Sequence, residues 1–138
     1  MRSQLYFDLT APAPRPSVYF REASEVDLTV RELATEDCAV FEIMGTAIHS
    51  LQELFTAVAI AFKKPEGWYG DEEYAPNANA FLEYLDDVGE WVPAKIQVAL
   101  IREATALWRN SPKIAGDIIE LWQSAICRGA RIRLVFVW

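Results

Sequence analysis

Residues 38–64, with the sequence CAVFEIMGTAIHSLQELFTAVAIAFKK, predict a β-strand followed by an α-helix. The run that ends at Gly45 is β-branched and aromatic, long enough for a strand and too short for a helix. Ser50 and Glu53 then have the spacing of a helical capping box, and apolar residues recur with helical periodicity as far as Phe62. We expect this strand and helix to begin the main domain.

The chain beyond this unit continues to alternate helices with strands. A loop with Gly and Pro begins at Pro65, and a second helix is expected from about Asn77 to about Val88. Two further strands are expected at residues 95–102 and 131–138, with a short helix at 103–109 and a longer one at 111–129 between them. Strands joined by helical crossovers favour a parallel sheet. The expected fold class is α/β, a three-stranded parallel sheet packed with about four helices.

Residues 1–37 have a different pattern. The runs LYFDL and SVYF are typical of short strands on either side of the extended segment APAPRP, and EVDLTVREL could form another strand. We therefore expect a β-rich N-terminal extension, packed on the main domain as an added edge. The chain would then divide into residues 1–37 and residues 38–138.

Composition excludes several functional classes. The 138 residues are 52% apolar, as in one folded domain, and no apolar run reaches the length of a signal peptide or a membrane span. The expected location is the cytoplasm, with no membrane partner. The net charge of −7 argues against direct nucleic-acid binding, which relies on Lys and Arg. Cys38 and Cys127 lack metal-ligand spacing and are expected to be reduced and buried.

The negative charge is concentrated in one segment. Residues 65–94 contain no Lys or Arg and eight acids, namely Glu66, Asp71, Glu72, Glu73, Glu83, Asp86, Asp87 and Glu90. Within the expected helix, Glu83, Asp86 or Asp87, and Glu90 recur every three to four residues and so line one side, where like charges repel. Such a surface favours a basic partner, and Trp68, Tyr69 and Tyr74 add side chains common in interfaces. A polar face that only aids solubility is the alternative.

Catalytic signatures are absent from the sequence. There is no glycine-rich phosphate loop, HExxH, CxxC or GxSxG motif, and the single histidine, His49, has no partner constellation. We expect no enzymatic activity, no cofactor and no metal site. The alternative from another class is a carboxylate- or metal-dependent hydrolase that uses Glu83, Asp86, Asp87 and Glu90.

The order and spacing of several segments resemble the barstar family, intracellular inhibitors of ribonucleases. The segments are FEIMGTAIHSLQELFTAVAIAF, Pro65 with WYG, NANAFLEYLDD, Pro93 before a strand, ALIREA and the final RIRLVFVW. In that family a loop and the second helix block the ribonuclease active site, with acidic side chains in the positions of phosphates. The resemblance thus implies an immunity protein or antitoxin whose partner is a basic ribonuclease toxin.

The resemblance also implies particular contact residues. Trp68 would be the aromatic contact of the loop, Leu82 a packing contact, and Glu83 the main anionic plug. The full set expected to bind the partner is Trp68, Tyr69, Asp71, Glu72, Glu73, Asn77, Asn79, Leu82, Glu83, Asp86, Asp87 and Glu90. A non-inhibitory interaction module on the same fold remains a further alternative.

Four positions depart from the family pattern. Glu83 and Asn79 stand where barstar has aspartates, Leu82 replaces a tryptophan, and Ser124 replaces a glutamate of the later helix. These differences imply a ribonuclease other than the classical one. Asp71, Glu72, Glu73 or Asp86 would then supply charge that is lost elsewhere.

Overall fold

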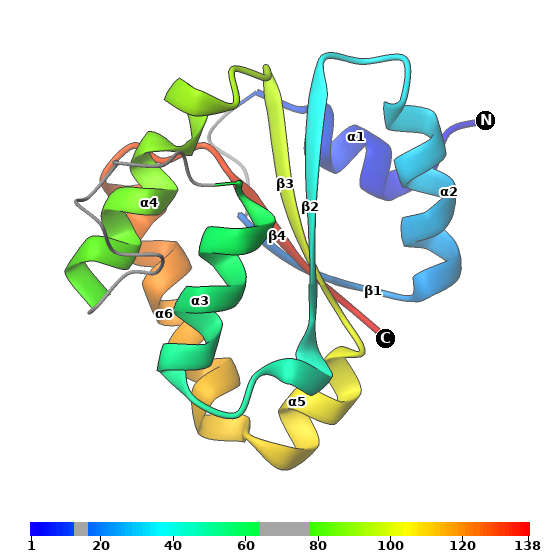
Figure 1. Cartoon of the computed structure of the whole chain (residues 1–138). Helices are drawn as coiled ribbons and strands as arrows, with labels where there is room; N and C mark the ends of the chain where they lie inside the picture. Colours follow the sequence, from blue (N-terminus) through cyan, green and yellow to red (C-terminus); the bar gives the residue numbers. More distant parts are fainter. Residues whose placement is uncertain (13–16, 64–77) are drawn as a thin grey trace.

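The protein is built on a four-stranded parallel β-sheet with helices on both faces (Figure 1). A computed structural model describes residues 1–12, 17–63 and 78–138. The strands lie in the order β1-β4-β3-β2. Their bounds are β1 Val18–Arg21, β2 Cys38–Met44, β3 Ile96–Arg102 and β4 Arg133–Val137.

The expectation of a parallel α/β fold is confirmed, but the expected strand number of three is wrong. The fourth strand is β1, which pairs with β4 in the register Val18 to Leu134. Strands β2, β3 and β4 are those expected from the sequence, and Phe41 of β2 lies beside Ala99 of β3. This strand lies at the edge of the sheet, within the N-terminal region that was expected to pack as an added edge.

Six α-helices occur in the described part of the chain; four lie in residues 38–138, where about four were expected, and the other two lie in residues 1–37. They are α1 Gln4–Thr10, α2 Ala23–Leu33, α3 Leu51–Ala61, α4 Ala78–Trp91, α5 Ala104–Asn110 and α6 Pro112–Cys127, with the 3-10 turn η1 at Gly45–Ala47. Helix α3 begins as expected, because the Ser50 hydroxyl accepts a hydrogen bond from the Glu53 N–H at 3.1 Å.

Each face of the sheet has its own apolar core. Helices α3, α4, α5 and α6 cover one face, where Phe62, Phe81, Trp122 and Phe136 belong to one buried cluster. Helices α1 and α2 lie on the other face (Figure 1). There Leu5, Leu9, Val26 and Leu33 pack with the strand residues Val98, Leu100, Val135 and Val137. The sheet is thus the middle layer of three.

The expectation that residues 1–37 are rich in β-structure is wrong. LYFDL lies within α1 and EVDLTVREL within α2, while SVYF contributes β1 as expected. The helices form because Leu5 and Leu9 are four residues apart, and Val26 and Leu33 seven, which places each pair on one helical face. The Ser3 hydroxyl caps α1 by accepting a hydrogen bond from the Tyr6 N–H.

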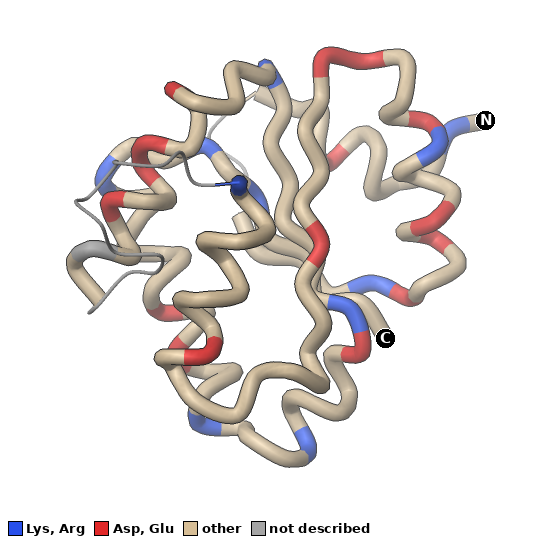
Figure 2. The backbone as a smooth tube through the Cα atoms, in the orientation of Figure 1, with Lys and Arg blue, Asp and Glu red and all other residues tan. Residues whose placement is uncertain are grey.

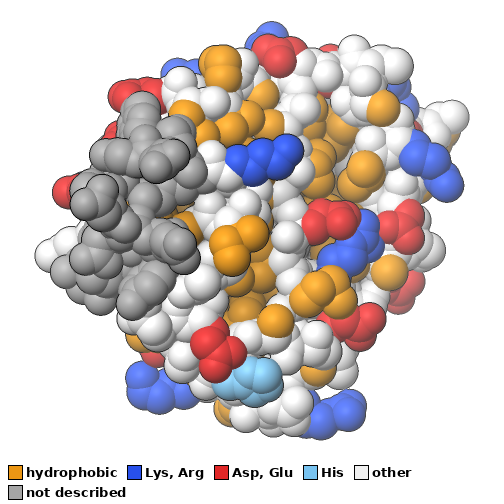
Figure 3. All heavy atoms as spheres, viewed as in Figure 1, with side chains coloured by type: hydrophobic (Ala, Val, Ile, Leu, Met, Phe, Trp, Pro, Cys, Tyr) orange, Lys and Arg blue, Asp and Glu red, His pale blue; other side chains and the backbone are white. Residues whose placement is uncertain are grey.

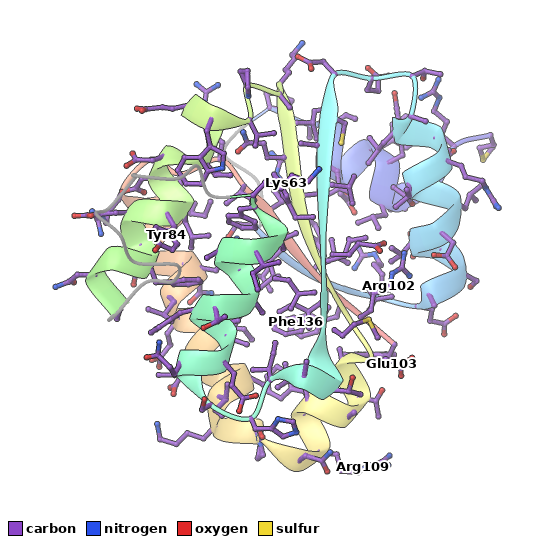
Figure 4. The ribbon with its side chains drawn as sticks, in the orientation of Figure 1. Lys63, Tyr84, Arg102, Glu103, Arg109 and Phe136 are labelled. Atoms are coloured by element: carbon purple, nitrogen blue, oxygen red, sulfur yellow. The ribbon has the colours of Figure 1, made fainter. Side chains whose placement is uncertain are left out.

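Polar contacts also join residues 1–37 to the remainder of the chain. Arg102 lies at the end of β3 (Figure 4). Its Nη1 is 2.9 Å from Oδ1 of Asp27 in α2, and its Nη2 is 3.0 Å from Oε1 of Glu42 in β2. Arg133 of β4 donates hydrogen bonds to the carbonyl oxygens of Leu9 and Ala11 at the end of α1. Guanidinium groups therefore tie both N-terminal helices to the sheet.

The carboxyl ends of β2 and β3 approach each other closely. A Cβ atom on Gly45 would lie 2.9 Å from the carbonyl oxygens of Arg102 and Glu103, so only glycine fits there. Glu103 itself has a φ of 55°, in the left-handed region. Strand β2 is an edge strand of the sheet. Apolar side chains gather alongside it, between α3 and α2 (Figure 3).

Both cysteines are free thiols. Both were expected to be buried, and neither is fully buried. Cys38 is half-buried and Cys127 is exposed at the end of α6. No helix within residues 1–12, 17–63 and 78–138 is long and apolar enough to cross a bilayer.

Candidate partner-binding surface

Helix α4 carries the acidic residues that the sequence analysis placed on one helical side. Its apolar stripe consists of Phe81, Tyr84, Leu85 and Val88, all of them buried (Figure 4 labels Tyr84). These side chains belong to the core between α3, α6 and the sheet. The helix is therefore fixed along its length by packing, which leaves its opposite side available as a preorganised surface.

The C-terminal end of α4 is held by two side-chain hydrogen bonds. The Trp91 indole N–H donates to the carbonyl oxygen of Phe62 at 2.7 Å, and the buried Gln97 amide donates to the carbonyl oxygen of Val92 at 2.9 Å. Because Phe62 follows α3 directly, α3 and α4 end beside each other (Figure 1). Helix α4 itself has 14 residues and is about 20 Å long.

We define the acidic face as Asn79, Glu83, Asp87 and Glu90 of α4. Asn79, Glu83 and Glu90 are exposed and Asp87 is half-buried. Glu83, Asp87 and Glu90 follow one another at four and three residues, so the structure brings them to one side of the helix as expected. Figure 2 shows acidic segments on α4 without any basic one. The face therefore presents negative charge opposite the buried stripe.

Asp86 has a counter-ion within the chain. Its Oδ2 is 3.2 Å from Nη2 of Arg128, the residue that caps α6. Burial raises the pKa of the Asp86 carboxyl above its usual value, Arg128 acts to lower it, and Asp87 and Glu83 raise it further. The sequence analysis, which matched the charges of this segment with a basic partner, missed this pair.

Arg128 is the residue of this surface that the sequence analysis did not find. It lies 42 positions after Asp86, and only the packing of α4 against α6 brings the two together. A signal was nevertheless present, because Arg128 directly follows the last turn of a predicted helix, where a cation is favoured.

Leu82 and Ser124 occupy two of the positions that depart from the family pattern. Leu82 is half-buried and packs against the core of the helical face, so part of its surface remains accessible. Ser124 is exposed on α6, one turn before Arg128.

The remaining expected contacts fall outside the described residues. They are Trp68, Tyr69, Asp71, Glu72, Glu73 and Asn77.

The hydrolase alternative would use a cluster of metal-binding or catalytic side chains. No group of three or more His, Cys, Asp or Glu side chains within residues 1–12, 17–63 and 78–138 is arranged to hold a metal ion. His49 is exposed, and its Nδ1 lies 3.2 Å from Glu53 Oε2 at the start of α3. A histidine paired with one carboxylate is not the set of three groups, a nucleophile, a base and an orienting group, that nucleophilic catalysis uses.

Comparison with known protein families identifies the chain. Residues 38–137, which begin with β2 and end with β4, match the family model described as Barstar (barnase inhibitor). The chain belongs to the barstar family. The matched region contains α4 with its acidic face and also Arg128, whereas α1, β1 and α2 lie outside it. No curated protein matches the chain.

Proposed function

We propose that this protein is an immunity protein or antitoxin that binds a ribonuclease toxin and blocks its active site. The acidic face of α4 would cover the catalytic centre, together with the preceding residues Trp68, Tyr69, Asp71, Glu72, Glu73 and Asn77. The protein would act in the cytoplasm, without contacting nucleic acid itself.

The observation that carries this proposal is the charge of α4 in a chain of the barstar family. The helix contains Glu83, Asp86, Asp87 and Glu90 and no Lys or Arg. A ribonuclease active site collects cationic groups that bind the phosphate of RNA and stabilise its negative transition state. Carboxylates on a rigid helix are suited to occupy the phosphate positions.

Glu83 has the main role in this proposal. It is exposed in the first half of α4, between the buried Phe81 and Tyr84, so its backbone position is fixed by the core. Its side chain has one methylene more than aspartate, and it reaches correspondingly further from the helix. Asp87 follows one turn later, and a pair of carboxylates at this spacing fits two basic groups of a partner.

An inhibition assay with two charge-reversal variants tests the proposal. The panel consists of purified ribonucleases that include barnase, and of any small basic protein encoded beside the gene. The unaltered protein should inhibit at least one of them, and Glu83→Lys should abolish this inhibition. Glu22→Lys is the matched control, because Glu22 is an exposed acid that precedes α2, on the opposite face of the sheet.

The outcomes separate the alternatives. Circular dichroism should show that both variants are folded, since neither side chain is buried. Equal inhibition by Glu83→Lys and Glu22→Lys would contradict the assignment of the acidic face. Absence of inhibition across the panel by the unaltered protein would contradict the proposed function and favour a non-inhibitory interaction module.

A further inference from the structure

Arg128 places a positive charge at the border of the acidic face. Its Nη2 lies 3.2 Å from Oδ2 of Asp86, and 45% of its side chain remains exposed. Its backbone is fixed by hydrogen bonds to the carbonyl oxygens of Ser124 and Ala125 at the end of α6. A protein that covers α4 on the side of Asp86 would therefore also meet Arg128.

The Asp86–Arg128 pair is poorly explained as a stabilising contact. The Asp86 side chain is only 24% exposed, and its Oδ1 is buried without a hydrogen-bond partner among the described residues. Burial is also the largest influence on the Asp86 carboxyl, and it raises the pKa despite the neighbouring cation. An ion pair whose desolvation cost offsets its attraction contributes little net stability.

We propose that Arg128 is a contact residue of the partner-binding surface, and that Asp86 is a positioning residue that orients its guanidinium toward a carboxylate of the partner. This inference rests on the proposed function and deepens it. An arginine has five N–H donors in a planar fork, so Arg128 can bind a second carboxylate while it keeps Asp86.

The proposal specifies the charge pattern of the partner. Basic groups should lie opposite Glu83, Asp87 and Glu90, and one carboxylate should lie beside them, opposite Arg128. A ribonuclease active site has this composition when a carboxylate is the general base that removes a proton from the ribose hydroxyl, next to cations that hold the phosphate. A uniformly basic surface would instead be repelled by Arg128.

Binding kinetics of the full-length protein test the proposal, with the ribonuclease of the panel that it inhibits most strongly. Arg128→Gln should raise the dissociation rate at least about tenfold, because a charged contact is lost from a covered surface. Arg131→Gln is the matched control, since Arg131 is also exposed and its loss changes the net charge equally. It should leave the dissociation rate within about twofold.

The sign of the effect is diagnostic. Long-range electrostatics alone predicts that loss of either arginine speeds association with a basic partner and tightens binding. Weaker binding by Arg128→Gln, alongside unchanged or tighter binding by Arg131→Gln, is therefore the expected result. If the two variants behave alike, Arg128 is not a contact and the proposal is wrong.

Two further variants test the positioning role of Asp86. Asp86→Asn should raise the dissociation rate without lowering the free energy of unfolding, whereas a merely structural pair would lose stability. The double variant Asp86→Asn with Arg128→Gln should dissociate no faster than Arg128→Gln alone, because Asp86 acts through Arg128. Additive effects would show that Asp86 is an independent contact.

The proposed function fails separately from this inference. If no ribonuclease is bound, the inhibitor assignment itself is wrong and the role of Arg128 falls with it. If Glu83→Gln leaves binding unchanged, the assignment of the acidic face is wrong. If Glu83→Gln weakens binding but Arg128→Gln does not, only the inference on Arg128 is overturned.

Discussion

The indole N–H of Trp91 donates a 2.7 Å hydrogen bond to the carbonyl oxygen of Phe62, which joins the end of α4 to the end of α3. Phe62 follows α3, so its carbonyl is one of those that a helix leaves without an internal partner. Trp91 thus satisfies an acceptor of one helix while it fixes the other, which is the helix that carries the acidic face.

Replacement of Trp91 by phenylalanine should lower the free energy of unfolding by about 1 kcal/mol, because the aromatic contact is largely kept and the hydrogen bond is lost. Amide hydrogen exchange in the last turn of α4 should become faster. Urea denaturation measures the first effect and mass spectrometry the second. Trp138→Phe is the control, since the Trp138 side chain is 48% exposed and should change neither measurement.

Association with the ribonuclease should depend steeply on salt. With a net charge of −7, the protein should attract a basic partner over distances that 0.5 M salt screens and 0.05 M salt does not. We expect the association rate to fall at least about tenfold between these conditions, with little change in the dissociation rate. Stopped-flow fluorescence measures both rates. A salt-independent association rate would argue against electrostatic recognition.

Glu83→Ala should act mainly on dissociation. If the carboxylate is covered by a paired cation in the complex, its removal should weaken binding by roughly 2 to 5 kcal/mol. Titration of the ribonuclease with the variant measures this loss. Gln123→Ala, at an exposed neutral position of α6, is the control and should bind normally. A loss below about 1 kcal/mol for Glu83→Ala would place Glu83 at the rim of the interface.

Residues 1–37 should be required for stability. Leu5 of α1 is 0% exposed, and Leu5→Ala should cost about 2 to 5 kcal/mol, as in other well-packed cores. Phe7→Ala, on the same helix but at a side chain that is 52% exposed, should cost less than about 1 kcal/mol. Equal and small effects in thermal unfolding would mean that α1 is a dispensable attachment.

Asp86 should make stability depend on pH in a defined direction. Because burial raises the pKa of its carboxyl in the folded state, ionisation of Asp86 is less favourable there than in the unfolded chain. Below the unfolded pKa, about 3.9, both states are protonated and nothing is lost. As the pH rises toward neutrality the folded state loses stability. The free energy of unfolding of Asp86→Asn should therefore rise relative to that of the unaltered protein between pH 3 and pH 7. A pH-independent difference in urea denaturation would contradict this.

The sequence predicted the family-matched region well because its local signals agree with the tertiary structure. The capping pair Ser50 and Glu53 starts α3, and the β-branched runs of β2 and β4 become strands of the sheet. The N-terminal region was wrongly expected to be β-rich because its apolar runs are short. In a run such as LYFDL, alternation and helical spacing are not distinguishable without knowledge of what Leu5 and Leu9 pack against.

In the candidate site too, features set by neighbouring residues were predictable and features set by distant residues were not. The position of Glu83, Asp87 and Glu90 on one side of a helix follows from spacing alone. The neutralisation of Asp86 does not, because it depends on the distance between α4 and α6 and on where α6 ends. A charge count along the sequence therefore overstated the negative charge that α4 presents.

The pairing of β1 with β4 also governs the order of events during synthesis. Val18 finds its neighbour, Leu134, more than a hundred residues later, so β1 emerges from the ribosome long before the strand beside which it must lie. Until then α1 and α2 can contact only each other and the earlier strands, and their apolar faces remain incompletely covered. Completion of the sheet is thus a late step, and a nascent chain that stalls before β4 exposes the surface that the finished protein conceals.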